Sequence, residues 1–182
     1  MADIMEAVAN ALKALIDDDP KPPLHVLEVG NCWAYLAYLG DALSVSQQAL
    51  NMTSDEDLSS AIHEELELVE IQKSKLQAFM IDEGIPLPPM LEQVPKCRQE
   101  DIPPGVKQTD YEIANALSLK IAFSIIACAK AISEAVRVDF GIMFTQFLGQ
   151  KIVYGTTLRA VMKQRGWLKV PPAYNPPGRP QD

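Results

Sequence analysis

The sequence has few of the residues on which catalysis and metal binding most often depend. Its 182 residues include two histidines and three cysteines, and Cys32, Cys97 and Cys128 form no C-x-x-C pair. This spacing provides neither a zinc motif nor a disulfide framework, so we expect free thiols in a reducing compartment. The nine glycines are scattered and form no phosphate-binding loop. We therefore assign no catalytic residue.

Positive charge and long apolar runs are also scarce. The formal net charge is −8. Nucleic acid or an anionic bilayer would require a basic face, so neither is an expected partner. The longest apolar run, 121–129, is about half of the length that a membrane-spanning helix needs. The N-terminus carries acidic residues and lacks the basic region that begins a secretion signal. These absences predict an acidic, soluble protein of the cytoplasm.

Helical periodicity covers most of the chain. Four long segments have inward-facing residues at alternating spacings of three and four, which is typical of helices packed among other helices. These segments are 24–52, 54–83, 110–137 and a fourth that begins after a turn at 136–139 and ends at Gly166. A shorter amphipathic helix is predicted for 2–17. The third long segment is apolar on nearly every side, which predicts a close-packed central helix that buries further surface by self-association.

The sequence also predicts where several of these helices begin and end. Thr53 with Glu56, and Thr109 with Glu112, have the T-x-x-E spacing of a capping box. Gly84 is expected to take the left-handed conformation that ends a helix, and the proline two residues later prevents its continuation.

Proline marks the connections between these helices. The region 84–108 contains six of the fourteen prolines and has no helical period, which is typical of a crossover that returns the chain along a bundle. A second proline-rich segment, 167–182, forms a tail, and 1–23 combines the short helix with an extended joint. The sequence therefore predicts one domain, 1–182, of the all-α class. We expect a ferritin-like antiparallel four-helix bundle with a long crossover between the second and third long helices, plus a short N-terminal helix.

Polar residues on the predicted inner faces raise the question of a metal site. A dimetal site of this fold needs two Glu-x-x-His pairs, and neither His25 nor His63 completes one. Two interpretations of the remaining inward polar residues stay open. They form either a hydrogen-bonded layer that fixes helix register, or a partial site for a single metal ion. The residues in question are Glu28, Glu65, Gln72 and Gln150.

Two weaker hypotheses concern other side chains. Cys97 lies between Lys96 and Arg98 in the proline-rich crossover, so it is either a reactive thiol or an incidental surface cysteine. Cys32 and Cys128 lie on packed faces, where thiols are usually inert. Methionines on the inner faces could leave an adaptable cavity for an apolar ligand.

Three strings carry a resemblance to a known family. LEVGNCW, FMIDEGIPLP and GWLKVPPAY resemble a ferritin-like family of unknown function from endospore-forming bacteria, which is similar to the F-type spore coat proteins. The resemblance spans 24–174. Members generally keep a glutamate at the position of Glu28, many have histidine where this chain has Gln72, and some have a carboxylate near Gly149 or Gln150. This chain departs from the pattern at those later positions.

The resemblance implies a four-helix bundle with a role in or near the spore coat. We therefore expect a structural or interaction protein without catalysis, located in the cytoplasm or spore coat, whose partners are copies of itself and other coat or cytoplasmic proteins. The alternative is a degenerate ferritin-like bundle that binds a metal or carries out redox chemistry.

Overall fold

The computed structural model describes residues 21–174. Four long helices follow one another: α2 (Val26–Met52), α3 (Glu56–Asp82), α4 (Asp110–Ser133) and α5 (Val138–Gln164). The described part of the chain contains no strand, and the predicted all-α fold is confirmed there. The helix predicted for 2–17 and the end of the tail, 175–182, lie outside the described residues.

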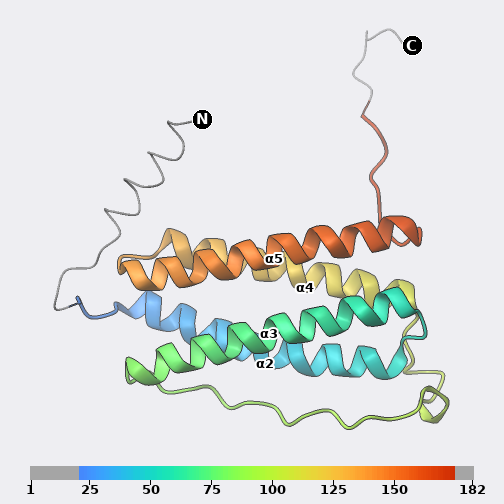
Figure 1. Ribbon diagram of the computed structural model, residues 1–182, viewed down its shortest axis with the longest axis horizontal. Helices are drawn as coiled ribbons and strands as arrows, with labels where there is room; N and C mark the ends of the chain where they lie inside the picture. Colours follow the sequence, from blue (N-terminus) through green and yellow to red (C-terminus); the bar gives the residue numbers. More distant parts are fainter. Residues whose placement is uncertain (1–20, 175–182) are drawn as a thin grey trace, which may run out of the picture.

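The helices form two hairpins that pack side by side (Figure 1). α2 packs on α3 and α4 packs on α5, while α2 also contacts α4 and α3 contacts α5. The connection from α3 to α4 runs along the outside of the bundle from one end to the other and contains one 3₁₀ turn, η1 (Gln99–Asp101). This return makes each contacting pair of helices antiparallel, as the predicted crossover requires.

Several helix ends match their sequence signals. Gly84 and Gly166 have φ angles of 69° and 72°, the left-handed conformation that glycine adopts without steric cost. Thr109 caps α4 through a reciprocal hydrogen-bond pair with Glu112. These three positions therefore set where α3 and α5 end and where α4 begins.

The predicted capping box at Thr53 and Glu56 is wrong. Asp55 is the N-cap of α3, and its carboxylate accepts a hydrogen bond of 2.9 Å from the Leu58 N–H. Thr53 instead ends α2, and its Oγ1 donates to Asp110 at 2.7 Å. The link between the two helices is so short that Thr53 is used to end the first. A charged carboxylate nearby is the stronger acceptor at the start of the second.

The hydrophobic core is divided into two clusters along the bundle axis. One lies around Leu36, Leu76 and Phe144, and the other around Ile62, Ile121 and Leu158. The buried residues of α2 and α3 follow the predicted spacing over most of each helix, and they include the polar residues Glu65 and Gln72.

Helix α4 is not buried on every side, contrary to the sequence prediction. Leu119, Phe123 and Ile126 expose 73%, 54% and 67% of their surface. Among the helices of the described residues, α4 alone is long and apolar enough by composition to cross a membrane, yet only 28% of its most apolar stretch is buried in the bundle. The helix therefore combines an inner core face with an apolar outer face.

Candidate functional site

A layer of buried polar side chains crosses the bundle near the middle of its helices. Every long helix contributes at least one residue, so the layer fixes how the four helices align along the axis. The residues of this layer are Ser46 from α2, Glu65 and Gln72 from α3, Lys120 and Ser124 from α4, and Lys151 from α5.

Glu65 is the charged centre of the layer. Its carboxylate is fully buried, and its Oε2 accepts a hydrogen bond of 2.6 Å from Ser46 Oγ. Lys120 Nζ lies 3.1 Å from Oε1, an ion pair that lacks the alignment of a hydrogen bond. The same ammonium donates to Ser46 Oγ and, at 3.2 Å, to the carbonyl of Ala42. The buried carboxylate is therefore matched by a cation from the neighbouring hairpin.

A second lysine, Lys151, lies in the same layer with 1% of its surface exposed. Burial lowers the pKa of its ammonium to about 8, with the attraction of Glu65 and the repulsion of Lys120 as smaller, opposing effects. Within residues 21–174, Lys151 has no hydrogen bond or ion pair. Burial also lowers the pKa of Lys120, and Glu65 opposes that shift. One buried carboxylate is thus accompanied by two amines of the same chain.

Gln72 connects three helices at the edge of this layer. Its Oε1 accepts a hydrogen bond of 3.0 Å from the Tyr35 hydroxyl. Its Nε2 donates to Gln150 Oε1 at 2.8 Å and to the Phe147 carbonyl at 3.3 Å. Both polar ends of the amide have partners, which satisfies a buried group that would otherwise be costly. The contact between Gln72 and Gln150 is a structural hydrogen bond.

Glu28 lies at one end of the bundle and does not face Glu65. Its Oε1 accepts hydrogen bonds from the Val136 and Arg137 N–H groups at 2.9 and 2.8 Å, where the chain enters α5. Its Oε2 accepts one from the His25 N–H at 3.1 Å. About 27 Å of helix separates Glu28 from the position of Ser46, which contacts Glu65, at 1.5 Å per residue. The four residues suggested for a partial metal site therefore do not converge.

The groups around Glu65 do not fit a metal ion. Within the described residues, no three histidine, cysteine, aspartate or glutamate side chains gather as metal ligands would. The groups in contact with the Glu65 carboxylate are the hydroxyl of Ser46 and the ammonium of Lys120, and the amines of Lys120 and Lys151 replace the positive charge that a metal would supply. Because a cation is repelled by ammonium groups, the layer is suited to holding helices together.

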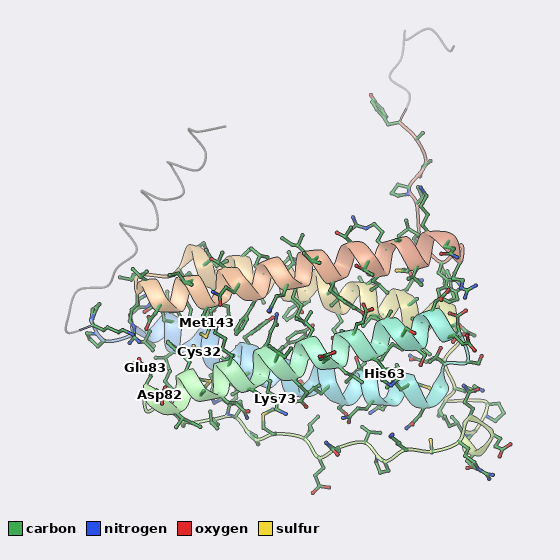
Figure 2. All side chains as sticks on the ribbon, viewed as in Figure 1. Cys32, His63, Lys73, Asp82, Glu83 and Met143 are labelled. Carbon is green, nitrogen blue, oxygen red and sulfur yellow. The ribbon has the colours of Figure 1, made fainter. Side chains whose placement is uncertain are left out.

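The three thiols have different environments. Cys32 and Cys128 are buried, and burial raises the pKa of the Cys32 thiol to about 12 and that of Cys128 in the same direction. Cys97 is exposed in the crossover. The neighbouring Arg98 forms ion pairs with Glu100 and Asp101, so its charge is already engaged. Cys32 and Met143, both labelled in Figure 2, belong to the same core cluster.

Sequence reasoning missed the two lysines. Strict alternation of three and four placed Gln150 on the inner face, but α5 turns Lys151 inward and leaves Gln150 exposed. A straight helix drifts by about 20° per heptad from that pattern, which is enough to exchange neighbouring positions. A lysine within an apolar stretch, as at Lys120, was the signal that could have found the layer.

The fold and its middle layer define a class of protein: a ferritin-like four-helix bundle whose buried carboxylate is neutralised by lysine. Residues 15–179 match a family described as a protein of unknown function, DUF3231, and the chain belongs to this family. The uncharacterized protein YvdQ of Bacillus subtilis is 28% identical over 152 residues, which cover 84% of this chain and 89% of that relative.

Solved structures of other proteins have a similar fold. A protein of Bacillus halodurans that is provisionally named a spore coat protein is 31% identical, with a TM-score of 0.83, and the match covers 85% of this chain and 98% of that chain. A two-domain protein of Anabaena variabilis with DJ-1-like and ferritin-like domains has a TM-score of 0.61 at 13% identity, over 84% of this chain and 41% of that one. The second likeness concerns the fold alone.

Proposed function

We propose that this protein is a non-catalytic structural or interaction protein of the spore coat, which works by binding copies of itself and other coat proteins. The observation that carries the proposal is the pairing of Glu65 with Lys120, with Lys151 beside them. The position at which a metal-dependent bundle would concentrate carboxylates holds ammonium groups instead. In this proposal the polar side chains in the middle of the bundle hold the four helices together.

Two further observations support this role. The relative from Bacillus halodurans, similar over nearly its whole length, is provisionally named a spore coat protein. The thiols that lie in the core, Cys32 and Cys128, have raised pKa values because they are buried, which makes them poor nucleophiles.

The location is tested with a fluorescent fusion expressed from the native promoter of a spore-forming host. We expect fluorescence to gather around the developing spore and to remain in washed spores. Uniform fluorescence of the mother-cell cytoplasm throughout sporulation would overturn the coat assignment.

The competing function, a degenerate metal-binding or redox bundle, is tested by metal analysis of protein purified without chelators. We expect no stoichiometric iron, manganese or zinc, and no change in melting temperature when these ions are added. One metal ion per chain, lost in a Glu65→Gln variant but kept in a Glu28→Gln variant, would contradict the proposal.

A further inference from the structure

The outer face of α4 carries a continuous apolar stripe. Ala116, Leu119, Phe123 and Ile126 follow one another at spacings of three and four, all exposed, and Ala122 widens the stripe. Lys120, the charged residue within this stretch, is turned inward to Glu65. An uncharged exposed stripe of this kind is typical of a helix that packs on another helix.

Grooves flank this stripe on both sides. A groove of about 520 Å³ lies between α4 and α2, beside Trp33 and Tyr38. A second, of about 300 Å³, lies between α4 and α5, beside Ile152 and Gly155. A ridge of side chains on a packed partner needs such grooves on either side of the helix that it crosses.

The stripe is self-complementary when it is reversed. Centred on Ile121, an antiparallel pair of α4 helices places Leu119 opposite the partner's Phe123 and the small Ala116 opposite the partner's Ile126. The next positions outward are Glu112 and Lys130, so each end of the stripe brings a carboxylate to the partner's ammonium. A parallel pair would instead place like charges together.

The groups at both ends have bonding capacity left for a partner. Glu112 uses only Oε2 to accept hydrogen bonds from Thr109, which leaves Oε1 available. Lys130 donates to Asn31 and Glu134, which leaves one of its three N–H groups.

We infer that the outer face of α4 is a homodimer interface in which two α4 helices pack antiparallel about a twofold axis near Ile121. A second copy of the chain fits better than a lipid bilayer because the two ends of the stripe have opposite charges and the protein is acidic, with a net charge of −8. The inference names a partner for the proposed binding function, yet it does not depend on the spore coat.

The mass of the full chain in solution provides the first test. Sedimentation velocity is expected to give twice the chain mass of 20.1 kDa. Phe123→Glu should raise the dissociation constant by about 30-fold or more, as removal of a central aromatic does in protein interfaces. Ile71→Glu, an equally exposed apolar position on α3, is the matched control and should leave the dimer intact. Unchanged helical circular dichroism in both variants excludes misfolding.

Disulfide cross-linking tests the geometry, in a Cys97→Ser background that removes the exposed native thiol. In the antiparallel pair the two copies of residue 122 are offset by about 3 Å along the axis, and those of residue 116 by about 15 Å. Ala122→Cys should therefore form a covalent dimer and Ala116→Cys should not.

Other results would overturn the inference. Cross-linking of both variants would mean a parallel pair, and a dimer that links through neither would use another face. A monomer would assign the stripe to another occupant, and flotation with lipid vesicles of the monomer but not of its Phe123→Glu variant would identify that occupant as a bilayer. A dimer with cytoplasmic localisation would remove the coat assignment and keep this interface.

Discussion

The bundle contains two fully buried glutamates that are stabilised in opposite ways. At the end of the bundle, Glu28 accepts hydrogen bonds from three backbone N–H groups, two of them where α5 begins. In the middle, Glu65 has one hydroxyl donor, Ser46, and the ammonium of Lys120. The first carboxylate joins the two hairpins through the main chain, and the second joins them through side chains.

This difference determines what each glutamate contributes. The donors to Glu28 are backbone N–H groups, which any sequence that forms this turn provides. Replacing Glu28 should therefore lower the free energy of unfolding by the value of a few hydrogen bonds. In the middle layer Lys120 is the amine that forms the ion pair with Glu65, whereas Lys151 forms none within the described residues. Loss of Lys120 therefore leaves the buried carboxylate without its ion-pair partner. Side-chain pairing therefore makes the middle of the bundle more sensitive to substitution than its end.

The largest effect is expected from Lys120→Met. The variant leaves the Glu65 carboxylate buried without its ion pair, which should lower the free energy of unfolding by about 3–5 kcal/mol. Denaturant titration followed by circular dichroism measures this. Lys163→Met, at an exposed position near the end of α5, should change stability by less than about 0.5 kcal/mol. An equal loss of unfolding free energy in the two variants would show that the ion pair of Lys120 with Glu65 does not stabilise the middle of the bundle.

Glu28→Gln is expected to have the next largest effect. The amide keeps the shape of the carboxylate but has one acceptor oxygen, whereas both oxygens of Glu28 accept hydrogen bonds from backbone N–H groups. At least one hydrogen bond is therefore lost and the others become neutral, which should cost about 1–3 kcal/mol. Glu64→Gln, on the exposed face of α3, serves as the control. A loss from Glu28→Gln that exceeds that from Lys120→Met would reverse the comparison.

The same end of the bundle should be sensitive to acid. Arg137 binds both Asp139 and Glu83 (Figure 2 labels Glu83), and it lowers the pKa of each carboxyl. A lowered folded pKa means that the stabilisation is present above the unfolded pKa and is lost as pH falls through the folded one. Asp139→Asn should therefore cost about 1–2 kcal/mol at pH 7, after allowance for solvent screening. The variant should also lose less stability than the wild type between about pH 5 and pH 2. Parallel pH profiles would contradict this.

The smallest expected effect has the opposite sign. Lys151 is buried without a hydrogen bond or ion pair within the described residues, so Lys151→Met should stabilise the protein by about 1 kcal/mol at pH 7. Burial lowers the folded pKa of Lys151 to about 8, below the ordinary lysine value of 10.5. The unfolded chain therefore binds more protons between these two pH values, and wild-type stability rises with pH there. The advantage of the variant should therefore shrink between pH 8 and pH 10. Destabilisation at pH 7 would show that Glu65 needs both amines.

Much of the fold could be predicted because each element depends on local signals. Helix periodicity, the left-handed Gly84, the Thr109 capping box and the proline-rich crossover are properties of short stretches of chain. The α2–α3 link was mistaken because two competing capping residues, Thr53 and Asp55, lie two positions apart, and tertiary contact with Asp110 decides between them.

The middle layer could be predicted only in part. Glu65 and Gln72 were identified because polar residues interrupt an apolar seam, but their partners come from other helices. Which side chain of α5 is buried depends on the accumulated turn of a straight helix, so Lys151 is buried in the layer while Gln150, which still accepts the hydrogen bond from Gln72, lies at its exposed edge. Glu28 was placed beside Glu65 because both face inward, although position along the axis separates them.

The central claim is that the Glu65 carboxylate is neutralised by Lys120 of the same chain. A double-mutant cycle of unfolding free energies with Glu65→Gln, Lys120→Met and the double variant measures that coupling directly. We expect the double variant to be more stable than Lys120→Met alone, with a coupling energy of at least about 2 kcal/mol. Additive losses from the two single substitutions would contradict the account.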